Sequence, residues 1–216
     1  FLLNVIQRLN QRDEFVSVEA KRKATSPLLA EKDRLEKALK EDKADEIEFA
    51  IRRILLIHGV ILTSGGIPLI YLGDEIGTLN DYTYRDDPAH ERDSRWVHRP
   101  RADWEKYEKR NDINAVEGRV YQGLKKLIGL RKQLEAFAGG ELEIIQTENE
   151  HVLGFMRIHA GKRAVIFANF SEASQKIPAR IFEQYSIYSK KYLHGLGAKT
   201  ASGDPTIEPL DFLVFG

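Results

Sequence analysis

The sequence predicts an α/β segment in residues 1–138 followed by an antiparallel β-sandwich in residues 139–216. First, a helical segment leads into Ile67–Leu72, an uncharged run of strand formers typical of strands buried on both faces in α/β proteins. Second, a strongly amphipathic helix follows a long stretch without periodicity. Third, from Gly139-Gly140 onward the chain changes to short apolar runs separated by turn residues, as in all-β domains.

Three helices are predicted before the buried strand, from apolar residues at helical spacing. Phe1–Lys23 carries a short helical pattern, and Asp33–Lys40 is a heavily charged helix. A longer helix begins at Ala44 and ends at Gly59 or a little later, and His58 on its apolar stripe is interpreted as a packing residue rather than a catalytic one. The apolar positions are Leu2, Val5, Ile6 and Leu9 in the first pattern and Ile47, Ile51, Ile54 and Leu55 in the long helix.

Residues 73–113 show no periodicity and are rich in Asp, Arg, His and Tyr. Loops longer than about 12–15 residues in a compact domain are usually functional or disordered. Disordered segments are poor in aromatic residues, so the aromatic content of this loop predicts an ordered active-site loop. Its aromatic residues include Tyr82, Tyr84, Trp96, Trp104 and Tyr107.

After this loop, Asn114 is a candidate N-cap of an amphipathic helix. The helix is expected to end near Phe137, where the sandwich should pack on it. Turns at Glu148–Glu150 and His159–Gly161 have hairpin spacing, and no helix is expected between the strands. The apolar side of the helix holds Val116, Val120, Leu124, Leu127, Ile128 and Leu134, and the clearest strands are Leu142–Gln146, Val152–Ile158, Arg163–Phe170 and Ile207–Phe215.

Bulk properties narrow the class of protein. The 216 residues include 33 basic and 33 acidic ones, and this balance argues against nucleic acid as a partner. There is no cysteine for a disulfide or a thiolate metal site. No apolar stretch approaches the roughly 20 residues that span a bilayer, and no signal peptide is visible. We therefore expect a cytoplasmic protein without membrane, nucleic-acid or cofactor partners.

Two phrases resemble the α-amylase family of glycoside hydrolases and transglucosidases, and most closely its amylosucrases and sucrose hydrolases. The first is GGIPLIYLGDEIGTLNDY at Gly65–Tyr82, which is similar to the eighth barrel strand and the start of its loop. The second, DSRWVHRPR at Asp93–Arg101, is similar to the pocket-facing part of that loop. It is characteristic of far fewer members of the family than the first motif. The likeness covers roughly Ala30–Gly216 and fails before about Pro27, where the chain is charged.

The resemblance implies a (β/α)8 TIM barrel followed by a C-terminal β-sandwich. Such a barrel takes roughly 250 residues and eight strands. Only one barrel strand is recognisable here, so residues 1–138 are expected to be the last repeat or repeats of the barrel, with the active-site loop at 73–113. Residues 139–216 would be the C-terminal β-sandwich domain, and the chain would be a C-terminal fragment.

Retaining glycosidases use two carboxyl groups about 5–5.5 Å apart. In the resembled family, an Asp nucleophile, a Glu acid/base and a third Asp do this work, and none of the strands that carry them is recognisable here. No catalytic residue is therefore assigned. Asp74 and Glu75 are not interpreted as the catalytic pair, because neighbours on a strand point to opposite faces. The resemblance makes them support for the pocket wall.

Arg95 is the expected substrate-binding residue. In amylosucrase-like enzymes, the Arg of the Ser-Arg-Trp element pairs with an Asp from the early barrel and closes the glucosyl pocket. A guanidinium can clamp a carboxylate bidentately and still donate to sugar hydroxyls. With that Asp outside the chain, Arg95 is expected to be unpaired; the alternative is a surface arginine in a loop. Trp96 and His98 are interpreted as packing the loop in support of the pocket.

The acidic residues of the loop permit a second interpretation, a calcium site. Their spacing matches no ordered ligand loop, and Arg85 and Arg92 are interleaved among them, so a salt-bridged, solvated loop is favoured and no metal site is expected. The acidic residues in question are Asp86, Asp87, Glu91 and Asp93.

The function implied by the resemblance is a retaining glucosyl transfer from sucrose to an α-1,4-glucan or to water. Sucrose and α-glucan would be the partners of the parent enzyme, and the fragment alone is expected to be inactive. The alternatives are another α-amylase-family hydrolase, a non-catalytic carbohydrate- or partner-binding remnant, and an unrelated helical and β protein. The sequence leaves open hydrolysis against glucan synthesis and the oligomeric state.

Overall fold

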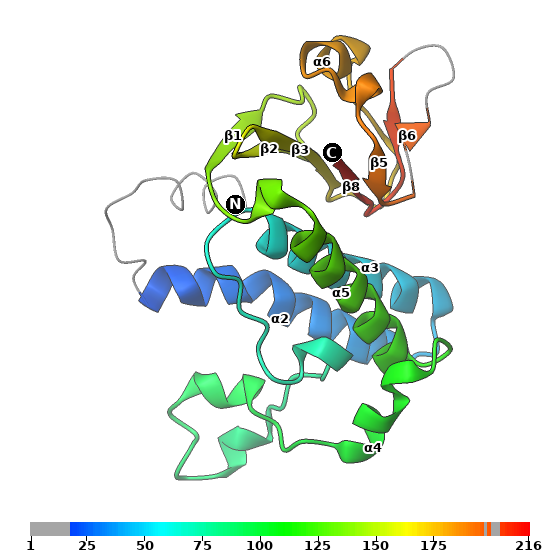
Figure 1. The fold of residues 1–216 in the computed structure, drawn as a ribbon. Helices are drawn as coiled ribbons and strands as arrows, with labels where there is room; N and C mark the ends of the chain where they lie inside the picture. Colours follow the sequence, from blue (N-terminus) through cyan, green and yellow to red (C-terminus); the bar gives the residue numbers. More distant parts are fainter. Residues whose placement is uncertain (1–17, 197, 200–203) are drawn as a thin grey trace. The chain divides into compact units, whose positions relative to one another are not determined.

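The computed structural model describes residues 18–196, 198–199 and 204–216, and these form two compact units (Figure 1). One unit contains residues 18–54 and 69–124; the other contains residues 55–68 and 125–216. The helical pattern predicted from Phe1 lies outside the described residues as far as position 17.

Three long helices contribute to the two units. They are α2 (Val18–Lys40), α3 (Ala44–Thr63) and α5 (Val116–Gln133). In the first unit, ion pairs join them: Arg53 of α3 lies 3.6 Å from Glu31 of α2, and Arg119 of α5 pairs with Glu48 of α3. Helix α3 and the helix after the loop were expected from the apolar spacing, whereas α2 is longer than the predicted charged helix.

The predicted strand Ile67–Leu72 is wrong: these residues are irregular, and no strand pairs with them within the described chain. A parallel strand requires hydrogen-bonded neighbours reached through crossover connections, and this region offers none. Residues 73–113 are instead an ordered series of short helical turns. These are η1 (Asp74–Ile76), η2 (Thr83–Asp86), η3 (Ser94–His98), α4 (Trp104–Glu108) and η4 (Lys109–Asn111).

The second unit contains two antiparallel sheets. The larger has the order β1-β2-β3-β8-β5 and the smaller β4-β7-β6, and the first three predicted strands are confirmed as β1, β2 and β3 with only small shifts of their ends. The strands are β1 (Glu141–Ile145), β2 (Val152–His159), β3 (Lys162–Asn169), β4 (Gln175–Lys176), β5 (Tyr192–His194), β6 (Ala198–Lys199), β7 (Thr206–Ile207) and β8 (Phe212–Phe215).

Two features of this unit differ from the expectation. The final strand is split into β7 and β8, because Leu210 has a left-handed φ of 53° that no continuous strand accommodates. The expectation of no helix between the strands is also wrong, because α6 (Ala179–Gln184) and η6 (Ile187–Ser189) follow β4. Helix α6 has only 6 residues, too few for a clear helical period, and buries Ile181 and Phe182.

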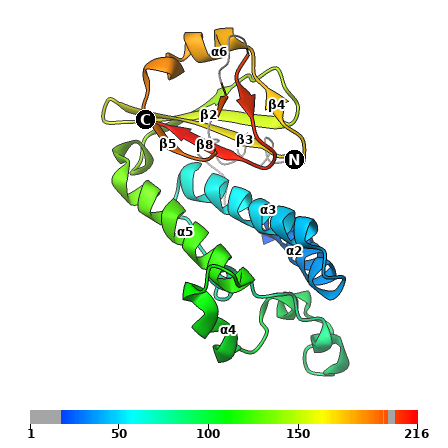
Figure 2. The same ribbon diagram turned by 90° about the vertical axis from the view of Figure 1, so that its right-hand side faces the viewer.

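The core of this unit is aromatic. Phe167 of β3 stacks on Phe182 of α6 with ring centroids 5.3 Å apart, and Phe215 of β8 meets both rings edge-on. Figure 2 shows α6 on one side of the larger sheet. A side chain at Gly59 of α3 would approach the ring of Phe212 to 3.0 Å, so glycine lets α3 pack closely on β8.

Two arginines hold the end of α3, Arg157 from the larger sheet and Arg131 from α5. Arg157 of β2, only 3 % exposed, donates to the carbonyls of Ser64 and Gly139 at 2.7 and 2.6 Å. Burial and the neighbouring Arg131 lower the pKa of the Arg157 guanidinium. Arg131 of α5 itself donates to the carbonyls of Leu62 and Gly66. Cations at the C-terminus of a helix complement its dipole, so these bonds hold the turn that precedes residue 67.

Candidate functional site

The predicted pocket supports Asp74 and Glu75 lie on a tight turn, η1, between Gly73 and Gly77. Both glycines have positive φ, 98° and 66°, which favours glycine at these positions. The Glu75 carboxylate accepts the backbone N–H of Gly73 at 2.6 Å, so it closes the turn on itself. The Gly-Asp-Glu phrase therefore forms a rigid turn, and its two carboxylates have different partners.

Asp74 is held by a buried ion pair. Lys32 of α2 donates from Nζ to Asp74 Oδ1 at 2.6 Å, and the two side chains are 7 % and 11 % exposed. Taking both charges out of water costs free energy, which their attraction offsets only with good geometry. Because Lys32 and Asp74 are 42 positions apart in sequence, this pair fixes the Gly-Asp-Glu turn on helix α2.

A second set of contacts joins α2 to the same loop. Asp33 accepts hydrogen bonds from the amide of Asn80 at 2.7 Å and from the phenol of Tyr82 at 2.8 Å. Asn80 also donates to the carbonyl of Leu29 at 2.9 Å. Burial and the Asp33 carboxylate raise the pKa of the Tyr82 phenol, so it stays a donor near neutral pH. The first half of the loop is therefore attached to α2 at two neighbouring positions.

His98 ends η3 beside the Lys32–Asp74 pair. Burial lowers the pKa of its imidazole, Lys32 lowers it further, and Asp74 acts in the opposite direction. The resulting neutral ring can donate from one nitrogen and accept at the other. Tyr107 lies near Glu75, and burial together with that carboxylate raises the pKa of its phenol.

Arg95 is paired, so the expectation that it would lack a carboxylate is wrong. Its guanidinium binds Asp93 bidentately, with Nε 2.8 Å from Oδ1 and Nη2 2.7 Å from Oδ2. The Asp93 carboxylate also accepts the Arg95 backbone N–H at 3.1 Å. Arg95 thereby lowers the pKa of Asp93 to about 2. The Arg95 side chain remains 67 % exposed, so donors are left at the surface of the loop.

Trp96 packs within the loop. Its ring centroid lies 3.8 Å from that of His90, and the guanidinium of Arg99 lies 5.5 Å from the indole centroid. A cation over an indole face is attracted by the ring quadrupole. Trp96 is half-buried in this stack. These contacts order the second half of the loop.

A small cavity of about 140 Å³ lies between the Gly-Asp-Glu turn and the end of η3. His98 contributes to its lining and Arg95 does not. This volume is below the range of about 300–1,000 Å³ usual for ligand pockets. Of the predicted site residues, only His98 lines this cavity; Asp74 and Glu75 follow Gly73, which also lines it, and Arg95 and Asp93 form a separate pair outside it. The lining includes Tyr71, Leu72, Gly73, Thr78, His98, Arg99 and Tyr107.

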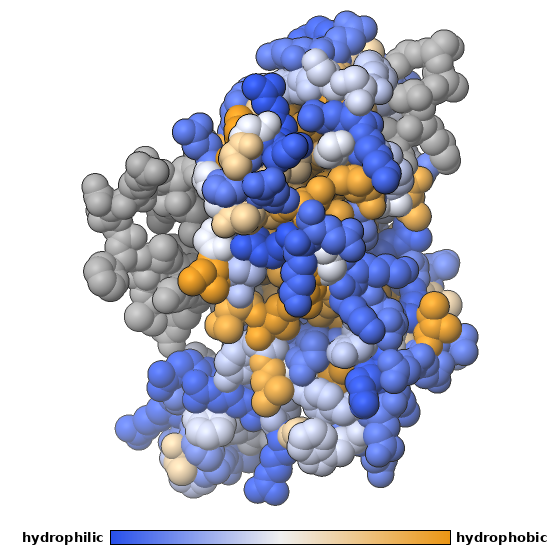
Figure 3. All heavy atoms as spheres, viewed as in Figure 1, coloured by the Kyte–Doolittle hydropathy of each residue, from blue (hydrophilic) through white to orange (hydrophobic). Residues whose placement is uncertain are grey.

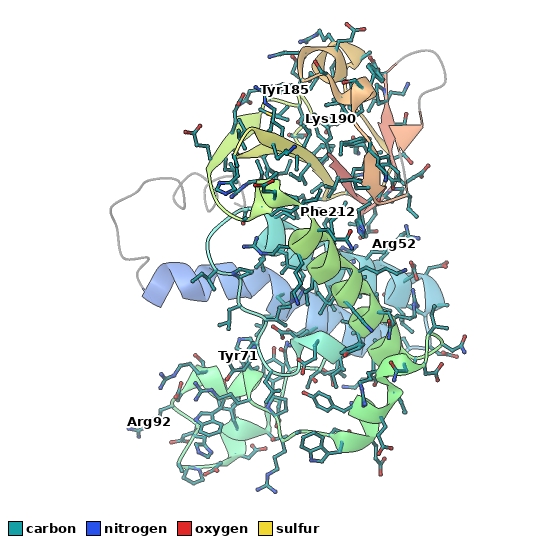
Figure 4. The ribbon with its side chains drawn as sticks, in the orientation of Figure 1. Arg52, Tyr71, Arg92, Tyr185, Lys190 and Phe212 are labelled. Atoms are coloured by element: carbon teal, nitrogen blue, oxygen red, sulfur yellow. The ribbon has the colours of Figure 1, made fainter. Side chains whose placement is uncertain are left out.

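Three of the four acidic residues weighed as calcium ligands, Asp87, Glu91 and Asp93, have other partners. Asp87 lies 2.8 Å from the imidazole of His90, Asp93 binds Arg95, and Glu91 lies 3.6 Å from Arg92. Within the described residues, no three His, Cys, Asp or Glu side chains are arranged to hold a metal ion. The side chain of Arg92 points away from the loop (Figure 4). Among the helices that the structure describes, none is both long and apolar enough to cross a membrane.

Three residues of the site, Lys32, Asp33 and Asn80, were not singled out from the sequence, and Tyr82 was noted only as one of the aromatic residues of the loop. Lys32 and Asp33 read as ordinary charges on a surface helix, and Asn80 and Tyr82 as loop residues. Their side-chain hydrogen bonds join residues that are 42 to 49 positions apart in the sequence, and no local sequence pattern predicts such contacts. The one available signal is that each lies within Ala30–Gly216, the part of the chain that resembles the family.

Comparisons with curated proteins give distant, partial matches, and no family model matches the chain. The chain is 29 % identical to a trehalose synthase of Thermus thermophilus over 146 residues, which are 57 % of this chain and 15 % of that protein. It is 30 % identical to a cyclomaltodextrinase of Geobacillus thermopakistaniensis over 132 residues, which are 61 % of this chain and 19 % of that protein. The chain therefore spans less than a fifth of the length of these relatives.

Solved structures share the fold at low sequence identity. A Group B Streptococcus pullulanase bound to maltotetraose has a TM-score of 0.59 and 18 % identity, and the match covers 84 % of this chain and 28 % of the pullulanase. A trehalose-6-phosphate hydrolase of Bacillus licheniformis has a TM-score of 0.55 and 18 % identity, covering 76 % and 38 %. The curated relatives and the structural neighbours of this chain are glycoside hydrolases of the α-amylase family.

Proposed function

We propose that the chain is the C-terminal portion of a retaining, amylosucrase-like enzyme that transfers the glucosyl unit of sucrose to an α-1,4-glucan or to water. The observation that carries this proposal is the Asp93–Arg101 motif, which resembles only a small part of the family. It follows the Gly-Asp-Glu turn in the same ordered loop. The α-amylase-family relatives support the broader class of α-glucoside-acting enzyme. One structural neighbour, the sucrose isomerase MutB, is described as bound to sucrose as its substrate.

In this proposal the loop forms part of the wall of the glucosyl pocket, and Arg95 contacts the substrate. The exposed guanidinium exchanges or shares its bond to Asp93 with a carboxylate from the rest of the barrel, and its remaining N–H groups donate to sugar hydroxyls. Asp93 keeps the guanidinium extended until then, because the bidentate bond fixes its plane. The buried Lys32–Asp74 pair and the neutral His98 hold the adjoining wall in place.

The nucleophile and the acid/base are expected on other strands of the family's barrel. Without them the covalent route is lost, together with proton transfer, which contributes about 10²–10⁴ in rate. We therefore expect the purified 216-residue chain to release no glucose or fructose from sucrose. Turnover that persists after contaminating host enzymes have been removed would contradict the fragment interpretation.

The role of Arg95 is tested in an enzyme in which the chain completes a full barrel. Arg95→Ala should lower kcat/KM for sucrose by at least about 10²-fold, whereas thermal unfolding should be unchanged because the residue lies on an exposed loop. Arg95→Lys should rescue poorly, since an ammonium cannot make the bidentate clamp. The matched control is Arg92→Ala, another exposed arginine of the loop, which should leave kcat/KM unaltered.

If Arg95→Ala retains the wild-type kcat/KM, Arg95 is a surface arginine and the amylosucrase assignment fails. The second candidate, another α-glucoside-acting enzyme of the family, is favoured by the trehalose synthase and cyclomaltodextrinase relatives. Turnover of trehalose or a cyclodextrin in place of sucrose by the completed enzyme would select it. Saturable glucan binding without turnover by the completed enzyme would select a carbohydrate-binding remnant.

A further inference from the structure

The small cavity between the Gly-Asp-Glu turn and the end of η3 has two arginines in its lining, Arg99 and Arg101. Both residues are exposed, and within the described chain neither makes an ion pair with a carboxylate. By contrast, Arg95 of the same loop is paired with Asp93. A guanidinium keeps its charge at every pH at which a protein is folded, so two uncompensated positive charges stand at one cavity.

Arg99 is held in place by uncharged groups. Its Nε donates to the Tyr71 hydroxyl at 3.2 Å, and its guanidinium carbon lies 5.5 Å from the centroid of the Trp96 indole. These contacts use one of the five N–H donors of the guanidinium and leave the terminal nitrogens without a partner in the described chain. Arg99 is therefore a preorganised cation, which loses little side-chain freedom when an anion binds.

The cavity has uncharged donors as well. Thr78 lines it, and the Thr78 hydroxyl makes no hydrogen bond to any described residue. His98 also lines it, and an imidazole donates from at least one ring nitrogen. Two guanidinium groups together with a hydroxyl and an imidazole suit a ligand group that is negatively charged and carries several acceptor oxygens.

The two carboxylates of the Gly-Asp-Glu turn do not cancel this charge. Asp74 is paired with Lys32 at 2.6 Å, and Glu75 accepts the backbone N–H of Gly73 at 2.6 Å. Neither carboxylate residue belongs to the lining of the cavity. Even with the charge of Glu75 counted, the two arginines leave an excess of positive charge at this place.

The size of the cavity decides how much of a ligand enters it. A volume of about 140 Å³ is below the usual range for a whole ligand, so the cavity takes one compact group. A phosphate monoester carries a charge of about −1.5 to −2 near neutral pH and has three strong acceptor oxygens. A carboxylate has a single charge and two oxygens, which one arginine satisfies bidentately. Two unpaired arginines therefore favour a phosphate group.

An aromatic pair adjoins the cavity. Tyr107 belongs to its lining, and Trp104, 72 % exposed, has its ring centroid 5.4 Å from that of Tyr107. In the space-filling view, most of the surface over the loop and α4 is hydrophilic (Figure 3). The aromatic pair is therefore a small isolated apolar face, sized for the C–H face of one sugar ring rather than for a protein partner.

We propose that this cavity is a binding site for a hexose phosphate. Arg99 and Arg101 bind the phosphate oxygens, Thr78 donates to one of them, and the sugar ring stacks on the Trp104–Tyr107 pair outside the cavity. The site goes beyond the proposed function and does not depend on it, since neither sucrose nor an α-1,4-glucan carries a phosphate. Free phosphate shares the chemistry of the charged group, and the experiment separates the two ligands.

The test is isothermal titration calorimetry of the 216-residue chain with glucose 1-phosphate, glucose 6-phosphate, inorganic phosphate and glucose at one ionic strength. At least one of the two glucose phosphates should bind one-to-one and at least about 5-fold tighter than inorganic phosphate, because the ring adds apolar contact. Glucose should give no measurable binding. Higher salt should weaken the binding of the glucose phosphate, since the site is at the surface.

Matched variants assign the contacts. Arg101→Gln and Arg99→Gln should each weaken binding of the glucose phosphate at least about 10-fold, since each removes hydrogen bonds to a charged group. Trp104→Ala should remove the advantage of the sugar phosphate and leave the affinity for inorganic phosphate unaltered. The control is Arg92→Gln, which makes the same change of charge at a 94 % exposed side chain of the same loop and should bind like wild type.

The substituted side chains are exposed, so the variants should fold, and thermal unfolding checks this. Arg101 makes no hydrogen bond within the described chain, so its variant reports on the ligand alone. The proposal is overturned if neither glucose phosphate binds saturably, or if Arg92→Gln weakens binding as much as Arg101→Gln. Equal affinities for inorganic phosphate and both glucose phosphates would also overturn it, because the ligand would then be the free anion.

Discussion

Strands β1–β3 and the segment Ile67–Leu72 both contain many strand formers, but only the three strands form a sheet. The β2–β3 ladder runs from Val152 opposite Asn169 to His159 opposite Lys162, so its partners are joined by a single tight turn. Ile67–Leu72 is equally rich in strand formers but has no partner in the described chain. An antiparallel hairpin carries its own neighbours, whereas a parallel strand depends on distant residues. Strand propensity therefore predicts where a strand can form, and the neighbouring chain decides whether it does.

The largest expected effect on the free energy of unfolding comes from removing a ring from the aromatic core of the sheet. Phe167→Ala removes a fully buried ring that stacks on Phe182, and it should lower the free energy of unfolding by about 3–5 kcal/mol. Leu69→Ala, in the exposed segment, should change it by less than about 0.5 kcal/mol. Urea denaturation followed by circular dichroism measures both. Equal losses would mean that residues 67–72 are already packed.

The buried ion pair gives the next effect. Lys32→Met leaves the Asp74 carboxylate buried without its cation and should cost about 3 kcal/mol. The control is Lys37→Met on the same helix, whose lysine is 69 % exposed and lies 4.0 Å from Glu41; it should cost less than about 1 kcal/mol. The measurement is chemical denaturation of the unit formed by residues 18–54 and 69–124, monitored by the fluorescence of Trp96 and Trp104. Similar small costs for both lysines would show that the loop does not depend on α2.

A smaller effect is expected at the turn before Ile67–Leu72. Gly65 has a φ of 118°, and a Cβ there would collide with the Arg157 guanidinium. Gly65→Ala should therefore destabilise the unit that contains the two sheets by about 1–3 kcal/mol. Gly129→Ala is the matched control, because a Cβ at this helical position meets nothing within 4 Å and should stabilise by about 0.5–1 kcal/mol. Thermal unfolding compares the two. A stabilising Gly65→Ala would mean that Arg157 does not hold this turn.

The smallest effect is a pH dependence that involves His98. Its pKa in the folded chain lies below the ordinary value of 6.5, so between the two values the unfolded chain binds more protons. The free energy of unfolding should therefore fall as the pH drops below about 6.5. His98→Gln should reduce this fall without abolishing it, because burial also lowers the pKa of His194. Urea midpoints between pH 5 and 7 provide the measurement.

An NMR titration separates the causes of the His98 shift. In Lys32→Met, the loss of the nearby positive charge should raise the pKa of His98, whereas Lys37→Met should leave it unaltered. If the wild type and His98→Gln showed the same pH dependence of stability, His98 would be exposed to solvent in the folded chain. That outcome would separate His98 from the buried pair.

The sequence by itself determined the elements whose stabilising partners are close in the chain. The helical period of α3 and the hairpins of β1–β3 were predicted from such local patterns. The split of the last strand was not, because it depends on the left-handed Leu210 and on Asp211, whose carboxylate accepts the Leu196 N–H at 2.9 Å. The Gly-Asp-Glu and Asp93–Arg101 motifs were recognised from the sequence, but their tertiary contacts were not predicted.

The tertiary structure alone decided which charges meet. Nothing around Lys32 or Asp33 in the sequence distinguishes them from the exposed lysines and glutamates of the same helix. They became part of the site because folding brings α2 against a loop more than 40 positions away, where burial makes each unpaired charge costly. Likewise, the pattern of Ile67–Leu72 predicts a strand, but a strand exists only where hydrogen-bonded neighbours and apolar layers are present to bury it.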